Sequence, residues 1–119
     1  MASIAKKALA TAEAFTGNAT TSAVSLDART DDYILFMNIT ALGAATSLVV
    51  TVQHSPDGTN WFTLVAFTAA VATGTQIRDQ ASFATAGANI FPNMRLSLAF
   101  TGGATTATLT CELYYDPRK

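Results

Sequence analysis

The sequence contains little of what small folds use for cross-linking or for acid–base chemistry. It has one cysteine, Cys111, and one histidine, His54, among its 119 residues. A single cysteine excludes a disulfide within the chain, so the fold needs a hydrophobic core of its own. A chain of this length can bury such a core without a metal or a cross-link.

Charged residues are also scarce. They make up 13% of the chain, against about a quarter in typical proteins, and the formal net charge is −1. Proteins that bind nucleic acid usually present a basic face or stripe. Here the adjacent basic pairs, Lys6 with Lys7 and Arg118 with Lys119, stand at the two ends of the chain. We therefore expect no nucleic-acid partner.

Long hydrophobic runs are missing as well. No stretch reaches the roughly 18 apolar residues of a membrane-spanning helix. Glu13 interrupts the Ala-rich segment after Lys7, so the start of the chain lacks the apolar region of a signal peptide. We expect a protein that is made in the cytoplasm, with no export signal and no membrane partner.

Half of the residues are hydrophobic, and from about residue 23 they fall into short runs separated by Gly-, Asn-, Asp- or Ala/Thr-rich connections. The predicted strands cover residues 23–28, 33–40, 47–55, 61–68, 75–81, 90–100 and 107–115. Short strands with regular turn signals are typical of a sandwich or a barrel. The predicted fold is all-β, an antiparallel β-sandwich of about seven strands, Ig-like or jelly-roll-like, in one domain over residues 23–119.

The predicted strands differ in how their apolar side chains are distributed. Residues 94–100 and 107–115 largely alternate between apolar and polar side chains, as strands do when one face lies on a core and the other in water. Residues 33–39 and 48–52 are apolar on both faces. We expect these two strands to be central in their sheets or covered by a partner.

The first 22 residues lack a clear strand pattern. Residues 5–15 are rich in Ala and suit a short helix, which is marginal in isolation, and residues 16–22 suit an extended link. We interpret residues 1–22 as an N-terminal arm that becomes ordered when something binds it. The arm residues expected to contact that partner are Lys6, Lys7, Leu9 and Phe15.

Neither the cysteine nor the histidine has the neighbours that catalysis requires. A cysteine nucleophile needs a cation, a histidine or a helix N-terminus to lower its pKa, whereas Cys111 stands between Leu109 and Leu113 on the apolar side of its strand. His54 ends the apolar side of another strand. We expect a buried thiol and a locally hydrogen-bonded histidine, with no catalytic residue, no metal ligand and no cofactor.

Three acidic residues, Asp27, Asp31 and Asp32, cluster in one predicted loop. Calcium prefers six to eight oxygen ligands, but this spacing matches no EF-hand. Arg29 stands among the acids and can neutralise them. We favour a solvated turn over a calcium site.

The segment Ser-Pro-Asp-Gly-Thr-Asn at residues 55–60 is the clearest turn in the chain. Pro56 presets φ, Asp57 tolerates turn geometry and Gly58 accepts a positive φ. We predict a structural hairpin that joins residues 47–55 to residues 61–68. Trp61 is expected to act as a large apolar plug over its base.

The same segment resembles a known group of proteins. Residues 48–64 run from a strand into the pattern Gln-x-Ser-x-Asp-Gly-x-x-Trp and then into a second strand, which resembles small virion structural proteins of tailed bacteriophages. The segment Ile-Phe-Pro-Asn-Met-Arg-Leu-Ser-Leu at residues 90–98, with the turn and strand after it, is similar to the same group. The likeness spans residues 30–116 and is strongest to capsid decoration, or cement, proteins.

The resemblance implies a structural protein rather than an enzyme. It would bind the major capsid protein on the outside of the capsid lattice, stabilise that lattice and reside on the virion surface as a homo-oligomer, often a trimer. A head–tail connector or tail component is one alternative. A carbohydrate-binding or adhesion module is another, because Ser-x-Asp-Gly-x-x-Trp also occurs in discoidin-like domains. The Ala-, Thr-, Gly- and Asn-rich loops argue against a sugar platform.

Overall fold

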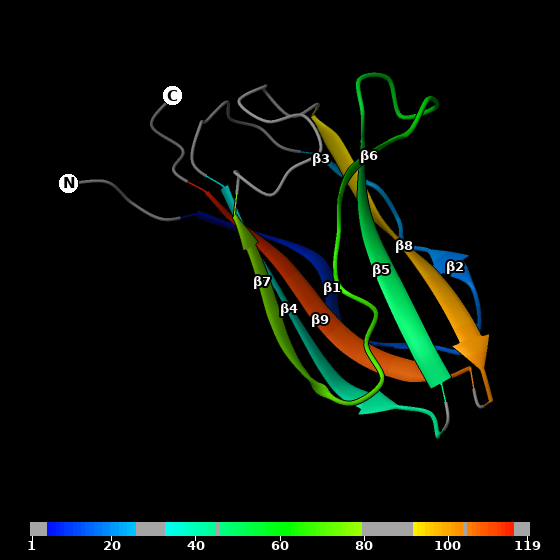
Figure 1. The fold of residues 1–119 in the computed structure, drawn as a ribbon. Helices are drawn as coiled ribbons and strands as arrows, with labels where there is room; N and C mark the ends of the chain where they lie inside the picture. Colours follow the sequence, from blue (N-terminus) through cyan, green and yellow to red (C-terminus); the bar gives the residue numbers. More distant parts are fainter. Residues whose placement is uncertain (1–4, 26–32, 45, 80–91, 104, 116–119) are drawn as a thin grey trace.

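The structure, a computed structural model, describes residues 5–25, 33–44, 46–79, 92–103 and 105–115 (Figure 1). Within these residues the chain forms nine strands and no helix. The strands are β1 (Ala5–Phe15), β2 (Ala19–Thr20), β3 (Val24–Ser25), β4 (Tyr33–Leu42), β5 (Thr46–Ser55), β6 (Phe62–Ala66), β7 (Gly74–Asp79), β8 (Asn93–Gly102) and β9 (Ala107–Tyr115). They pack as two antiparallel sheets, so the predicted all-β sandwich is confirmed.

The order of the strands, which the sequence left open, follows from their pairing. Sheet A has the order β1-β9-β4-β7, and sheet B has the order β2-β8-β5-β6 with β3 also paired to β8. Only β2 with β3 and β5 with β6 are consecutive strands of one sheet, and between all other consecutive strands the chain changes sheets. As predicted for strands that are apolar on both faces, β4 and β5 each lie between two other strands.

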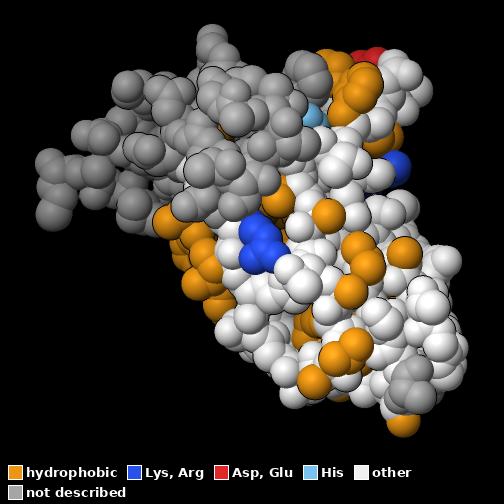
Figure 2. Space-filling view, in the orientation of Figure 1, with side chains coloured by type: hydrophobic (Ala, Val, Ile, Leu, Met, Phe, Trp, Pro, Cys, Tyr) orange, Lys and Arg blue, Asp and Glu red, His pale blue; other side chains and the backbone are white. Residues whose placement is uncertain are grey.

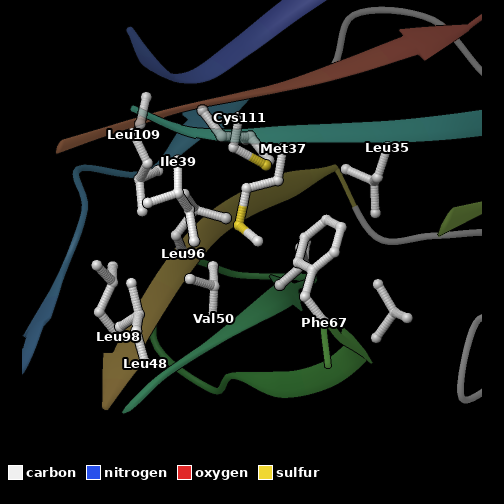
Figure 3. Packing of buried hydrophobic residues seen from close by; sticks show 14 of the residues in the cluster. Leu35, Met37, Ile39, Leu48, Val50, Phe67, Leu96, Leu98, Leu109 and Cys111 are labelled. Atoms are coloured by element: carbon white, nitrogen blue, oxygen red, sulfur yellow. The ribbon is translucent and has the colours of Figure 1, made fainter. Parts of the chain in front are cut away.

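The inner faces of the two sheets form one hydrophobic core (Figure 3). Strands β4, β5, β8 and β9 alternate between buried and more exposed residues, as period-two patterning requires. Complete burial of a Leu or Met side chain stabilises the fold by about 1.5–3 kcal/mol. The largest fully buried side chains include Leu35, Met37, Leu109 and Leu113 from sheet A and Leu48, Val50, Leu96 and Leu98 from sheet B.

Residues 5–15 are the main departure from the sequence interpretation. They form β1, which pairs antiparallel with β9, and not a helix or an arm that lies apart from the sandwich. Ala, Lys and Glu favour helices in isolated peptides, but pairing with β9 and burial of Leu9 and Phe15 outweigh that preference. The pairing is irregular, with two register shifts and a left-handed φ of 44° at Ala12.

A short link carries the chain from sheet A to the edge of sheet B. The Asn18 side chain accepts a hydrogen bond from the backbone N–H of Phe100 at 2.7 Å. Thr21 exchanges two hydrogen bonds of 2.9 Å with the backbone of Leu96, one through its N–H and one through its hydroxyl. Residues 16–25 therefore cover the edge of β8 and belong to the sandwich.

The other predicted strands agree closely with the structure. Strands β4 and β8 extend two residues beyond their predicted ends, to Leu42 and Gly102, and β6 ends at Ala66, two residues before its predicted end. Residues 26–28, 80–81 and 90–91 of the predicted strands lie outside the described residues.

Candidate functional site

The hairpin predicted around residues 55–60 joins β5 to β6. One carboxylate oxygen of Asp57 accepts hydrogen bonds from the backbone N–H groups of Asn60 and Thr59 at 2.8 and 2.9 Å. These donors hold the pKa of the Asp57 carboxyl well below its usual range. The Ser55 hydroxyl accepts a hydrogen bond from the N–H of Gly58, whose φ is 79°. The turn therefore uses the polar groups of Asp57 internally, which gives this loop a structural role.

Trp61 lies at the base of this hairpin, outside the hydrophobic core. It is half-buried, directly precedes β6 and is not part of the core. The guanidinium carbon of Arg95 lies 4.2 Å from the centroid of its ring. The indole is thus stacked against a cation on the outer face of sheet B, which the prediction of an apolar plug did not include.

The four arm residues named from the sequence separate in the structure. Leu9 and Phe15 are 5% and 7% exposed and belong to the core. Lys6 lies at the surface, with its Nζ 3.1 Å from an Oε atom of Glu112, and Lys7 is half-buried. Leu9 and Phe15 cannot contact a partner while β1 stays in sheet A, so in this structure they stabilise the fold.

His54 and Cys111 both lie on inner faces of the sandwich and are buried. Burial raises the pKa of the Cys111 thiol to about 12, which disfavours the reactive thiolate. Burial also lowers the pKa of His54. The part of the chain that the structure describes has no group of three His, Cys, Asp or Glu side chains suited to a metal. The loop with Asp27, Asp31 and Asp32 lies outside the described residues.

Four apolar or aromatic side chains adjoin on the outer face of sheet A, and we call them the sheet A patch: Ile34, Phe36, Ile77 and Tyr114. Phe36 lies opposite Ile77 across β4 and β7, and Ile34 lies opposite Tyr114 across β4 and β9. Opposite residues on one face of a sheet are about 5 Å apart. Ile34 and Ile77 are 48% and 60% exposed, while Phe36 and Tyr114 are half-buried. Figure 2 shows hydrophobic side chains on the flank where β7 lies in Figure 1.

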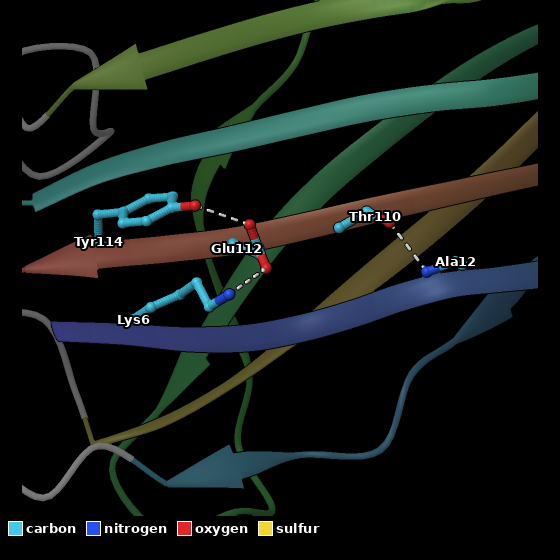
Figure 4. A network of polar contacts seen from close by, with 5 residues as sticks. All are labelled: Lys6, Ala12, Thr110, Glu112 and Tyr114. Carbon is cyan, nitrogen blue, oxygen red and sulfur yellow. Dashed lines mark hydrogen bonds and ion pairs between the residues drawn. The ribbon is translucent and has the colours of Figure 1, made fainter.

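A small polar network borders this patch (Figure 4). Glu112, which is opposite Phe36, accepts a hydrogen bond from the Tyr114 hydroxyl at 2.9 Å and pairs with Lys6 at 3.1 Å. The Tyr114 hydroxyl and Lys6 together lower the pKa of Glu112, and the carboxylate raises the pKa of Lys6. The border of the patch is therefore polar, and the positive charge of Lys6 compensates the negative charge of Glu112.

The sequence indicated part of this surface. Residues 33–39 were predicted to be apolar on both faces, and this segment contributes Ile34 and Phe36 to the patch. Ile77 and Tyr114 were not identified, because they reach the patch only through the pairing of β7 and β9 with β4. The available signal was an isolated Ile77 between two polar residues, Gln76 and Arg78.

The inward-facing residues of β7 explain why that signal was weak. The Gln76 side chain exchanges two hydrogen bonds with the backbone of Thr68, at 2.8 and 2.9 Å. Arg78 bonds to the Thr68 hydroxyl at 2.7 Å and stacks over Phe67 at 5.6 Å. The polar side chains of Gln76 and Arg78 thus face the interior at this side of the sandwich, whereas the apolar Ile77 points outward. This reverses the usual strand pattern, in which apolar side chains point inward and polar side chains point outward.

Comparison with known proteins does not assign the chain to a family. No protein-family model matches the chain, and no curated protein matches it in sequence. Across the described residues, no helix is long and apolar enough to cross a membrane.

Proposed function

We propose that this chain is a structural, non-enzymatic protein of a bacteriophage particle, which attaches to the outside of the capsid lattice and stabilises it. The resemblance of residues 48–64 and 90–98 to virion structural proteins is the reason for proposing a place in a bacteriophage particle. The observation that carries the proposal is the sheet A patch, which gives such a protein a surface for attachment.

The patch is unusual for a sheet face that lies in water. Antiparallel sheets commonly place polar residues on their solvated face, and single exposed apolar residues need no explanation. Here Ile34, Phe36 and Ile77 adjoin on two neighbouring strands. Complete burial of one such side chain is worth about 1.5–3 kcal/mol. Because Ile34 and Ile77 are about half exposed, covering each of them contributes about 1 kcal/mol to binding.

Attachment through this face would stabilise the lattice by mass action, since the protein would bind the assembled form preferentially. The proposed partner is the major capsid protein. A homo-oligomer, such as the trimer that the resemblance implies, would present several patches at once and gain avidity. Lys6 and Glu112 would lie at the rim of the contact, where exposed ion pairs contribute little.

Two further functions follow from the sequence. A head–tail connector or tail component would use the same kind of surface, and the rotational symmetry of the purified oligomer would distinguish it. A carbohydrate-binding module would need an accessible aromatic ring. Arg95 occupies one face of Trp61, so the ring that carries the discoidin-like pattern offers a sugar its other face alone.

The test is attachment of the purified chain to capsids that lack it. Ile34→Ser and Ile77→Ser should each weaken attachment about fivefold, which corresponds to about 1 kcal/mol. Val71→Ser is a matched control, because Val71 is 77% exposed but lies outside the patch. Failure of the wild-type chain to bind any capsid would overturn the proposed function. Equal binding by all three variants would instead show that the contact lies elsewhere on the molecule.

A further inference from the structure

The outer face of sheet B carries a guanidinium group that two neighbours hold in place. Arg95 lies on β8, with its Cζ 4.2 Å from the centroid of the Trp61 ring. Its Nε donates a hydrogen bond of 2.8 Å to the Oε1 of Gln53, the residue opposite on β5. All three side chains are half-buried. The ring and the amide together fix the plane and the direction of the guanidinium.

These contacts leave the terminal nitrogens of Arg95 for another ligand. Stacking uses the face of the guanidinium, and the bond to Gln53 uses its Nε. Arg78 shows the opposite case, since its terminal nitrogens bond to the Ile77 carbonyl, the Thr68 hydroxyl and the Gln76 side chain. Both arginines stack on an aromatic ring, but only Arg95 keeps its two terminal amino groups unused by the described residues.

Among the described residues, the surroundings of Arg95 provide no opposite charge. Its neighbours on this face are the uncharged residues Gln53, Thr63, Asn93 and Ser97. The one ion pair among the residues that the structure describes joins Lys6 to Glu112 in the other sheet. Arg95 is therefore a fixed cation without a carboxylate partner in the described part of the fold.

We propose that Arg95, held by Trp61 and Gln53, is a carboxylate-binding position for an Asp or Glu side chain of a partner protein. A planar guanidinium with two free terminal nitrogens matches a carboxylate bidentately. Because the group is already oriented, binding restricts it less than it would restrict a mobile arginine. A single cation among uncharged neighbours suits one carboxylate better than a phosphate backbone, which calls for several cations.

This site lies on the sheet opposite to the sheet A patch, so it does not depend on the proposed attachment to capsids. If both surfaces act, the sandwich has one apolar and one charged contact on opposite sides. Such an arrangement would let one copy bridge two neighbouring subunits.

Trp61 provides a direct readout, because it is the one tryptophan of the chain and it stacks on the guanidinium. The full chain is titrated with N-acetylglutamate amide, and N-acetylglutamine amide serves as the uncharged control at the same ionic strength. We expect a saturable change in Trp61 fluorescence, together with a shift of the Arg95 Nε–H resonance, for the carboxylate alone. The same response to both compounds would overturn the proposal.

Variants separate a bidentate site from a simple charge. Arg95→Lys keeps the charge but loses the fork, and we expect about tenfold weaker binding of the carboxylate. Gln53→Ala releases Nε and should weaken binding by a smaller factor. Arg78→Lys should leave the titration unchanged. Unaltered binding by Arg95→Lys in a chain with a native near-ultraviolet spectrum would contradict the assignment.

Inorganic phosphate forms the last arm of the experiment. We expect it to bind no more tightly than the carboxylate. Markedly tighter phosphate binding would overturn the assignment to an acidic side chain and would indicate a phosphate ligand instead.

Discussion

The left-handed backbone at Gly58 allows a quantitative test of the turn between β5 and β6. Gly58 has a φ of 79°, whereas the φ of Gly17 is not positive. A Cβ atom added at either position meets no atom within 4 Å. The two sites therefore differ in backbone conformation and not in available space, so the pair isolates the cost of the left-handed region.

The expected magnitude follows from two effects. An alanine in the left-handed region costs roughly 1–2 kcal/mol relative to a right-handed one. Replacing Gly by Ala also reduces the entropy of the unfolded chain, which stabilises the fold by about 0.4–1 kcal/mol at a compatible site. This second effect is common to both variants. Gly17→Ala should thus be slightly more stable than wild type, and Gly58→Ala should be about 1–2 kcal/mol less stable than Gly17→Ala.

Urea unfolding followed by Trp61 fluorescence measures this difference. We expect the two midpoints to differ by about 0.5–1 M with unchanged slopes. Gly58→Asn should recover part of the loss, because Asn tolerates the left-handed region better than Ala does. Equal midpoints for the two alanine variants would refute the turn geometry.

Three further predictions use the same unfolding measurement. Ala12 has a φ of 44°, so Ala12→Gly should leave the free energy of unfolding unchanged or raise it by up to about 1 kcal/mol. Ala14→Gly on the same strand should lower that free energy by about 0.5–1 kcal/mol. Similar losses at both positions would contradict this expectation. Burial lowers the pKa of His54, so the unfolded chain takes up a proton first, and stability should fall as the pH drops below about 6.5. His54→Gln should be less sensitive between pH 7 and 5, and parallel profiles would count against the assignment. The hydrogen bonds from Asn60 and Thr59 lower the pKa of Asp57, so its contribution is present above about pH 4 and is lost as the pH falls further. Asp57→Asn should therefore be destabilised at pH 7 by an amount that shrinks below pH 4, and a constant difference would contradict the account.

Local chemistry made several elements predictable. Pro56, Asp57 and Gly58 specify a tight turn through their own conformational preferences, and the structure has a hairpin there. The alternating patterns of β8 and β9 reflect one buried and one solvated face. In each of these cases the information lies within a few consecutive residues.

Long-range pairing made other elements unpredictable. The Ala- and Lys-rich β1 is a strand because it pairs with β9 and buries Leu9 and Phe15, and no local preference reveals that partner. The sheet A patch likewise depends on the strand order. Ile34 is visible as an excess of apolar residues in β4, but Ile77 joins it only because β7 pairs with β4.

The position of Arg95 illustrates the same limit. In the sequence it is one of a few scattered cations, 42 positions from Gln53. The pairing of β8 with β5 brings the two together, and the hairpin places Trp61 against the guanidinium. A sequence motif for this cluster would have to combine three separate segments.

The most direct test of the proposed function is electron cryo-microscopy of virions from the source lysate. We expect density for this sandwich on the outer capsid, with the sheet A patch buried against the major capsid protein. Density at the neck or tail, or no density for this chain on the particle, would contradict it.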